Sequence, residues 1–413
     1  MTGTIHIIGA GLAGLAAAIR LAEQGKRVVV HEANAQAGGR CRSFFDHTLQ
    51  MTIDNGNHLL LSGNRAALSF LDTVGARHHL VGPDTADFPF FDCGTGTRWT
   101  LRIGNGRIPF WIFDESRRVP GTRPLDYLKV APLLWAGKDR TVGDTIACQG
   151  PLFEKLIRPL LVAALNVGAE EGSARLAGAV VRETLFQGGQ ACRPLIAREG
   201  LTPAFIDPAL AFLRGKGAEI RLEHQLHAIA FAEDSARTLQ FADGDVALGP
   251  DDRVVLAVPF WIASALLPQI VAPTQTRAIV NGHFRFAPAA GIPPIMGLVN
   301  ATTEWIFAFP DRISVTISNA DRLVSGPRER LAQEIWAEIR AATGIAEPLP
   351  AWQIVRERRA TFASIPGEDA RRPGPKTRWS NLVLAGDWTD TGLPATIEGS
   401  IRSGFRAAQS LQD

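Results

Sequence analysis

The first thirty residues combine short apolar runs with glycines. Residues 5–8 are apolar and predict a buried strand, and the glycines after them predict a tight turn into a helix. The apolar face of this helix is formed by Leu12, Leu15, Ala16, Ile19 and Leu21. Gly25 ends the helix, and residues 27–30 predict a second buried strand. The succession of strand, helix and strand is typical of a parallel α/β sheet.

Later segments predict further strands and one long helix. Residues 239–248 form two short runs around an Asp-Gly pair and predict a hairpin. Strands are also predicted at residues 218–222, 253–258 and 313–317. Residues 327–342 carry apolar side chains at helical spacing, and Gly344 ends that helix. No apolar stretch reaches the roughly 20 uninterrupted residues of a membrane-spanning helix.

Composition narrows the class of protein. The chain has 413 residues, which suits two intertwined domains with a sizeable core. Its 43 basic and 41 acidic residues give a net charge of +2, which argues against a nucleic-acid partner. The four cysteines form no CxxC pair and have no metal-ligand spacing. We therefore expect a cytoplasmic protein without a metal or a signal peptide.

The glycine turn carries the first chemical signal. Gly9 permits the tight turn, Gly11 lets a phosphate approach the backbone, and Gly14 lets the helix pack against the strand. The helix N-terminus offers unpaired N–H groups and a positive dipole end to the phosphates. Glu32 ends the second strand, where a carboxylate accepts hydrogen bonds from ribose hydroxyls. These residues predict a dinucleotide site.

Two further segments extend this site. Arg40 follows Gly38 and Gly39, so its guanidinium can reach the same pyrophosphate; the alternative is a solvated arginine in a turn. Residues 382–388 and 394–401 supply a second glycine-rich segment near the other end of the chain. Together the two ends predict non-covalently bound FAD. The predicted cofactor-binding residues are Gly9, Ala10, Gly11, Leu12, Ala13, Gly14, Glu32, Ala33, Gly38, Gly39, Arg40, Asn55, Gly56, Asn57, Leu226, Val258, Gly386, Asp387, Pro394, Thr396 and Ile397.

This order of motifs resembles the flavin-dependent amine oxidase and carotenoid desaturase superfamily. The run from Asp54 to His58 is more specifically similar to the Asp-Asn-Gly-Gln-His signature of the hydroxysqualene dehydroxylases, with Asn57 in place of the usual Gln. Residues 356–363 and 386–400 also match that family. The similarity spans the whole chain and is strongest in the first 60 and the last 35 residues.

The resemblance implies an α/β fold, with a Rossmann-type FAD-binding domain and an inserted α+β substrate domain. We expect the FAD-binding domain at residues 1–78, 196–263 and 377–413, and the substrate domain at residues 79–195 and 264–376. The resemblance also implies that Leu226 lies near the adenine and Asp387 near the FAD linker. It places Thr396 and Ile397 beside the pyrimidine edge of the flavin.

The implied reaction is the reductive dehydroxylation of hydroxysqualene to squalene, a step in hopanoid biosynthesis. Protonation of the allylic alcohol and loss of water leave a delocalised cation, which takes a hydride from N5 of the reduced flavin. Asp54 and His58 are the candidate proton donors, because both are expected near the flavin ring. Each has an alternative: Asp54 can simply form a turn, and His58 can bond to the backbone. The sequence does not indicate the electron donor.

One segment predicts a membrane contact. Phe110, Trp111, Phe113 and Trp135 alternate with basic residues, a composition that suits the interface of a lipid bilayer. A hydrophobic isoprenoid substrate dissolves in such a bilayer, so we expect peripheral contact with the inner face of the cytoplasmic membrane. The alternative is that these aromatic side chains pack inside the substrate domain.

Three other functions stay open from the sequence. A carotenoid-type desaturase or saturase shares the C-terminal motif. An amine oxidase is less well supported for two reasons. Such enzymes often frame the flavin with tyrosines, and Tyr127 is the only tyrosine here, so another aromatic residue such as Trp388 would have to serve. Some also bind the flavin through a C-terminal cysteine, and no cysteine follows Cys192 in this sequence. A prenyl-binding protein of the GDP-dissociation-inhibitor type would have degraded flavin motifs, whereas the motifs here are intact.

Overall fold

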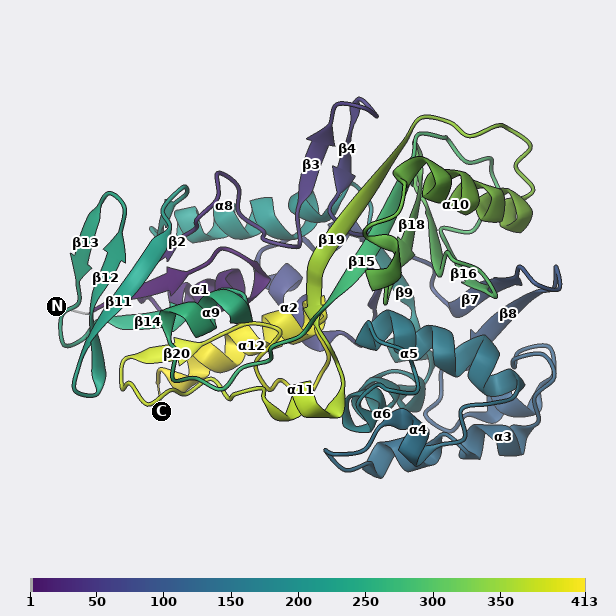
Figure 1. The fold of residues 1–413 in the computed structure, drawn as a ribbon, viewed down its shortest axis with the longest axis horizontal. Helices are drawn as coiled ribbons and strands as arrows, with labels where there is room; N and C mark the ends of the chain where they lie inside the picture. Colours follow the sequence, from purple (N-terminus) through teal and green to yellow (C-terminus); the bar gives the residue numbers. More distant parts are fainter. Residues whose placement is uncertain (1–2, 413) are drawn as a thin grey trace.

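A computed structural model describes residues 3–412 of the chain. Figure 1 shows a parallel sheet with its helices on one side of the molecule. A second, larger sheet and a group of short helices lie on the other side. Among the described residues, no helix is long and apolar enough to span a membrane.

The first sheet has five parallel strands. In spatial order they are β10 (Glu219–Arg221), β2 (Arg27–His31), β1 (Thr4–Ile8), β14 (Arg253–Leu256) and β20 (Leu382–Leu384). The central strands are buried on both faces, which explains their continuous apolar runs. The helices around this sheet are α1 (Leu12–Glu23), α2 (Arg65–Thr73), α8 (Asp207–Gly215), α9 (Phe260–Leu266) and α12 (Ile397–Ser410). Of these, α1 packs directly against α12, so the two ends of the chain meet.

A small antiparallel sheet extends the chain between β10 and β14. Its strands are β11 (Leu226–Ala232), β12 (Ser235–Phe241) and β13 (Gly244–Ala247). The predicted hairpin is confirmed; its two-residue turn is Ala242-Asp243, and Gly244 already pairs with Phe241 as the first residue of β13.

The second large sheet has seven mixed strands. In spatial order they are β19 (Trp352–Phe362), β15 (Thr276–Phe284), β18 (Ile313–Ile317), β17 (Trp305–Ala308), β16 (Ile295–Val299), β7 (Ala86–Asp92) and β8 (Arg98–Ile103). Helix α10 (Arg328–Thr343) covers one face with Leu331, Ile335 and Ile339, which pack on Val315 and Val280. The opposite face carries polar side chains at its centre. That face is turned toward the loop at residues 54–58.

Short helices make up the remaining body. They are η2 (Phe110–Phe113), α3 (Pro124–Leu128), η3 (Ala131–Trp135), α4 (Val142–Thr145), η4 (Phe153–Ile157), α5 (Arg158–Leu165), α6 (Ala174–Glu183), η5 (Leu185–Gln187) and α7 (Gly189–Cys192). The connecting elements are β3 (Ser43–Asp46), β4 (Met51–Asp54), β5 (Leu60–Leu61), η1 (Arg77–His79), β6 (Leu80–Val81), β9 (Pro194–Ala197), η6 (Thr202–Ile206), η7 (Asp321–Leu323) and α11 (Pro366–Ala370). Figure 1 shows α3, α4, α5 and α6 grouped together, away from the parallel sheet.

The elements predicted from the sequence agree with the structure. The first strand, helix and second strand are β1, α1 and β2, and the alternating run at residues 313–317 is β18. Gly344 adopts a left-handed conformation, with φ +78°, at the end of α10. All five parallel strands come from the segments predicted for FAD binding, and all seven mixed strands come from those predicted for the substrate domain. The domain boundaries themselves stay a prediction.

Candidate functional site

The glycine turn between β1 and α1 has the geometry of a phosphate cradle. Gly9 has φ +105°, a conformation that disfavours any side chain, and its N–H donates to the carbonyl of His31 over 2.7 Å. Gly11 is the N-cap of α1, and no side chain caps the first turn. The N–H groups of that turn therefore have no partner within the helix and point toward an outside acceptor.

Two glycines of this turn have different surroundings. A Cβ placed on Gly11 would have no atom of the protein within 4 Å, so open space lies over this residue. A Cβ placed on Gly14 would collide with the carbonyl oxygen of Gly9 and lie 3.2 Å from Ala257 Cβ. Gly14 is thus required for packing, whereas the space at Gly11 is free for a ligand. This space fits the pyrophosphate predicted from the sequence.

The Gly38-Gly39 turn forms the second wall of the cradle. Gly38 pairs with Gly11 in a parallel bridge, and its N–H donates to the carbonyl of Ala10 over 2.8 Å. Gly38 and Gly39 both have positive φ, at +112° and +57°. A Cβ on Gly39 would lie 3.6 Å from Gly11 Cα, so the two glycine turns face each other at close range.

Glu32 stands at the end of β2, beside the same turn. One carboxylate oxygen accepts the N–H of Ala10 over 2.8 Å, and the other accepts the backbone and side-chain N–H groups of Asn34 at 3.0 and 2.7 Å. These bonds fix the carboxylate at the mouth of the cradle. Leu226 lies near this point, because the N–H of His224, two residues earlier, donates to the carbonyl of Glu32.

The C-terminal segment meets the N-terminal motif through an ion pair. Arg40 Nη2 lies 2.7 Å from Asp387 Oδ1, and Nη1 donates to the carbonyl of Ala360. Burial alone would lower the pKa of Arg40, but Asp387 raises it above its ordinary value. The structure therefore brings two predicted residues together from opposite ends of the chain. The Arg40 guanidinium bonds to Asp387 and to the carbonyl of Ala360, both of which are groups of the protein itself.

Asp387 belongs to a turn that is held tightly on both sides. Gly386 has φ +150°, and its N–H donates to Ser403 Oγ over 2.8 Å. Trp388 is fully buried, and its indole N–H donates to the carbonyl of Val258 over 2.9 Å. The indole therefore braces this turn against β14, and the role of Trp388 in an aromatic cage is not supported.

Helix α12 begins directly after this turn. Thr396 is its N-cap, with Oγ1 accepting the N–H of Gly399 over 3.0 Å, and Ile397 is the first helical residue. A Cβ on Gly404 would collide with the carbonyl of Ala13 and lie 2.8 Å from Ala16 Cβ. The close packing of α12 on α1 thus places the N-terminus of α12 relative to the phosphate cradle.

The loop at residues 54–58 lies between the parallel sheet and the seven-stranded sheet. Asn55 N–H donates to the carbonyl of Arg42 over 2.9 Å. The Asn281 amide donates to the carbonyl of Asn55 and accepts the N–H of Asn57, at 3.2 and 3.3 Å. Asn57 Nδ2 donates to the carbonyl of Val315 over 3.0 Å, while its buried Oδ1 has no partner among residues 3–412. This orphaned oxygen sits next to Gly56, in the region predicted to contact the flavin.

The two predicted proton donors have very different surroundings. Asp54 Oδ1 accepts Ser43 Oγ–H and the N–H of Leu201, at 2.6 and 2.8 Å, and Oδ2 lies 4.0 Å from Arg312. Burial raises the pKa of Asp54 despite these partners. His58 makes no hydrogen bond to any described residue. Burial, and then the positive charge of Arg40, lower the pKa of His58 to about 4, so its imidazole is neutral at pH 7.

Several polar residues at this place were not predicted. His283 donates to or accepts from Ser314 Oγ over 2.9 Å, and burial followed by Arg312 lowers the pKa of His283 to about 3. Glu357, on β19, lies 3.4 Å from the amide of Asn55. The polar alternation of β15 and β18 is the signal that could have revealed His283 and Ser314, because directly opposite residues share one face of the sheet.

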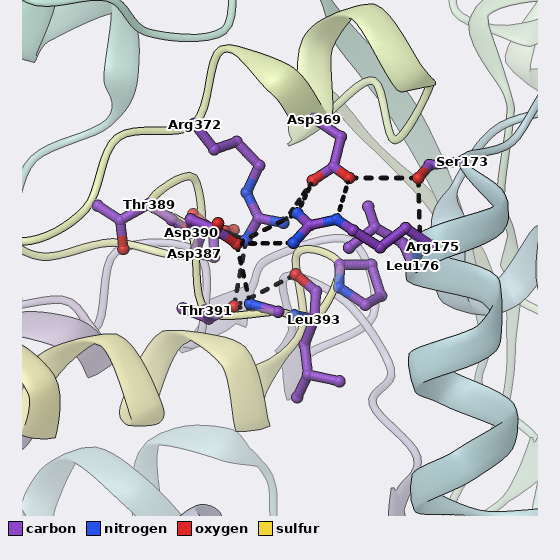
Figure 2. A network of polar contacts seen from close by, with 12 residues as sticks. Ser173, Arg175, Leu176, Asp369, Arg372, Asp387, Thr389, Asp390, Thr391 and Leu393 are labelled. Atoms are coloured by element: carbon purple, nitrogen blue, oxygen red, sulfur yellow. Dashed lines mark hydrogen bonds and ion pairs between the residues drawn. The ribbon is translucent and has the colours of Figure 1, made fainter. Parts of the chain in front are cut away.

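A network of charged side chains supports the C-terminal turn, and no sequence motif predicted it (Figure 2). Arg372 Nη2 donates to the carbonyls of Asp387 and Thr389 at 3.1 and 2.6 Å. Asp369 accepts from Arg372 and also from Arg175 of α6, at 3.1 and 2.6 Å. The network therefore ties the helical body to the turn that carries Asp387.

The predicted membrane segment is partly corrected by the structure. Phe110, Phe113 and Trp135 are exposed, whereas Trp111 is buried. The prediction that Trp111 belongs to a surface patch is wrong, because its ring packs edge-on against Tyr127 with centroids 5.3 Å apart.

Comparison with known proteins identifies the family of this chain. The sequence model of the flavin containing amine oxidoreductases matches residues 12–412. A protein of Rhodopseudomonas palustris named hydroxysqualene dehydroxylase is 58% identical over 409 residues, covering 99% of this chain and 98% of that protein. One of the same name from Sinorhizobium fredii is 55% identical over 408 residues, with 99% and 98% covered.

Solved structures show the same fold. Cyclohexylamine oxidase from Brevibacterium oxydans superposes with a TM-score of 0.72, covering 100% of this chain and 99% of that chain, at 17% identity. The chain is thus a flavoprotein oxidoreductase; it belongs to the flavin-containing amine oxidoreductase family and, within it, to the group of these hydroxysqualene dehydroxylases.

Proposed function

We propose that the protein is an FAD-dependent hydroxysqualene dehydroxylase that forms squalene for hopanoid biosynthesis. The observation that carries this proposal is the 58% identity to a protein of that name over 99% of the chain. The intact glycine cradle agrees with it, because a non-catalytic prenyl-binding protein does not need to keep a pyrophosphate site. The substrate is a C30 alcohol that dissolves in lipid, so we propose that the protein works in the cytoplasm, at the inner face of the cytoplasmic membrane.

The cofactor we propose is non-covalent FAD. The carboxylate of Glu32 suits the ribose of the adenosine half, and the open space over Gly11 suits the pyrophosphate. The N-terminus of α12 at Ile397 suits the pyrimidine edge of the flavin, where reduction leaves negative charge. Residues 193–413 contain no cysteine, so this segment offers no thiol for a covalent link to the flavin. Acid precipitation should release all of the FAD into the supernatant, and flavin retained by the pellet would contradict this assignment.

The reaction exchanges one C–O bond for one C–H bond. The allylic hydroxyl leaves as water after taking a proton, and the remaining carbon takes a hydride. Reduced FAD, when bound, supplies that hydride and its two electrons. The protein has to hold the carbon in place, exclude water and provide the proton.

We propose that His58 contacts the departing hydroxyl. The imidazole is half-buried and makes no hydrogen bond to a described residue, and because it is neutral at pH 7, its ring N–H orients the hydroxyl by a hydrogen bond without giving up its proton. Asp54 is less suited, because Ser43 and Leu201 already occupy Oδ1 and fix the carboxylate to the start of η6. Asp54 therefore shapes the loop that carries His58.

The reaction itself is tested anaerobically. Purified protein with chemically reduced FAD should convert hydroxysqualene to squalene, with one flavin oxidised for each squalene formed. The same reaction in D₂O should place deuterium on the carbon that lost oxygen. Squalene formed without a reductant, or reduced flavin left untouched by the alcohol, would refute the dehydroxylase. Desaturation of a polyene by the oxidised protein would favour the carotenoid-type alternative.

The role of His58 is tested with a matched pair of variants. His58→Ala should lower the single-turnover rate roughly 2- to 12-fold, the contribution of one neutral hydrogen bond to the departing hydroxyl, with the FAD content unchanged. Asp54→Asn should chiefly lower the unfolding midpoint, because it disturbs buried hydrogen bonds. A large rate loss in Asp54→Asn at unchanged stability, with His58→Ala fully active, would assign the contact with the hydroxyl to Asp54 instead.

A further inference from the structure

Large apolar side chains are exposed over a single stretch of the helical body. Ile108, Phe110, Phe113, Leu125, Leu128 and Trp135 are each 64–79% exposed. They account for six of the eleven exposed large hydrophobic residues of the described chain, yet they fall within 28 consecutive positions. Monomeric soluble proteins seldom gather such side chains in one place without a partner.

The segment is well folded beneath these side chains. Trp111, Val119, Val130 and Leu133 are buried in the main core, directly below η2, α3 and η3. The hydroxyl of Tyr127 accepts the N–H of Val119 over 3.0 Å, which joins α3 to the preceding loop. The apolar residues are thus exposed on a folded segment, in which inward-facing and outward-facing side chains alternate within short helices.

Charge distinguishes this surface from the rest of the molecule. Residues 102–140 hold eight basic and four acidic residues, a net charge of +4. The whole chain carries only +2, so the remainder of the protein is net negative. Arg107, Arg123, Lys129 and Lys138 are exposed among the apolar side chains. Aromatic side chains next to solvated cations match the headgroup region of an anionic bilayer.

We propose that residues 107–138 form a docking surface for an anionic lipid bilayer. The exposed apolar side chains enter the boundary between headgroups and acyl chains, and the basic side chains contact lipid phosphates. A second copy of the chain fits this surface poorly, because a symmetric contact would place two surfaces of net charge +3 against each other. In Figure 1 this surface lies around α3, on the far side of α5 and α6 from the parallel sheet, so bilayer contact leaves the nucleotide side in water.

Docking does not depend on the chemistry of the flavin site. Its use for taking up substrate rests on the proposed function, because only a lipid-soluble alcohol would be drawn from the bilayer. The test of docking therefore contains no substrate, and the test of substrate uptake is separate.

The docking test is co-sedimentation of the flavin-loaded full-length protein with vesicles. The vesicles are phosphatidylcholine with phosphatidylglycerol at 3:1, and phosphatidylcholine alone. The wild type should bind the anionic vesicles, and Phe110→Ser/Phe113→Ser/Trp135→Ser should lower the partition coefficient at least tenfold with unchanged flavin absorbance. The matched control is Phe45→Ser/Ile262→Ser/Val271→Ser, which removes three exposed apolar residues outside residues 107–138 and should bind like the wild type.

A second variant avoids any effect on packing. Arg107→Gln/Arg123→Gln/Lys129→Gln keeps the apolar residues and should lose binding to the anionic vesicles only. Wild-type binding by either docking variant, or an equal loss in the control, overturns the proposal. A lower oligomeric mass of the apolar variant in light scattering, with vesicle binding unchanged, would assign the surface to a contact between copies. For uptake, the apolar variant should keep its rate on detergent-dissolved hydroxysqualene and lose at least fivefold on vesicle-borne substrate.

Discussion

Gly11 and Gly14 allow the cofactor site to be tested separately from the fold. Gly11→Ala adds a methyl group in open space at an ordinary φ of −75°, so it should cost no stability. Replacing glycine at a compatible position stabilises by about 0.4–1 kcal/mol through the unfolded state. Gly14→Ala places a methyl group against the carbonyl of Gly9, and overpacking of this kind costs about 1–3 kcal/mol.

Gly11→Ala should weaken the binding of FAD although it does not lower the stability of the fold. The methyl group of Gly11→Ala occupies the space needed by the pyrophosphate and separates it from the N–H groups of α1. Loss of two hydrogen bonds to a charged group, at about 1.5–3 kcal/mol each, weakens binding by roughly 10²- to 10⁴-fold. The assay combines urea unfolding of the FAD-free proteins with titration by FAD followed by fluorescence.

The two variants should therefore differ in both FAD content and unfolding midpoint. Gly11→Ala should keep the unfolding midpoint of the FAD-free wild type and be colourless after purification. Gly14→Ala should have a lower midpoint even without FAD. If Gly11→Ala is purified with stoichiometric FAD, the pyrophosphate does not lie over Gly11 and the assignment of the cradle is wrong.

Two further predictions concern buried charges. Arg372→Met removes the donor to the carbonyls of Asp387 and Thr389 and leaves Asp369 with one positive partner fewer. Breaking a buried pair costs about 3–5 kcal/mol, so the urea midpoint and the FAD affinity should both fall. An unchanged FAD affinity would show that the network does not support the turn at Asp387. Burial lowers the pKa of His31 and of His283 to about 3, so between pH 6.5 and pH 3 the unfolded chain binds more protons than the folded one. The free energy of unfolding is therefore highest above pH 6.5 and should fall on acidification by up to about 1.4 kcal/mol per pH unit for each histidine. Urea titrations at pH 7 and pH 5 should show a smaller fall for His283→Asn.

The glycine turn between β1 and α1 could be predicted from the sequence because its signals are local. Gly9, Gly11 and Gly14 lie within six residues, and their backbone roles follow from the turn alone. The Arg40–Asp387 pair needed both ends of the chain, and each residue stood in a recognisable motif although their contact was not foreseen.

The remainder depended on tertiary packing. Arg175, Asp369 and Arg372 each stand in ordinary surroundings in the sequence, and only the fold brings α6 to the loop after α11. Trp111 shows the same limit. Hydrophobicity alone cannot say which aromatic residues of a short helix point inward, and here Trp111 does so while Phe113 does not.

The ion pairs also connect the helical body to the side of the molecule that contains the parallel sheet. Arg175 contacts Asp369, which also pairs with Arg372, and Arg372 binds the carbonyl of Asp387. Asp387 in turn pairs with Arg40 beside the glycine cradle. This chain of contacts runs from the helical body, which bears the proposed docking surface, to the glycine turn. Because each buried charge needs its neighbour, the helical body cannot shift without exposing or unpairing one of them. A lipid substrate entering from the bilayer side would therefore meet a flavin held at a fixed distance, and its uptake would not require the two halves of the protein to move apart.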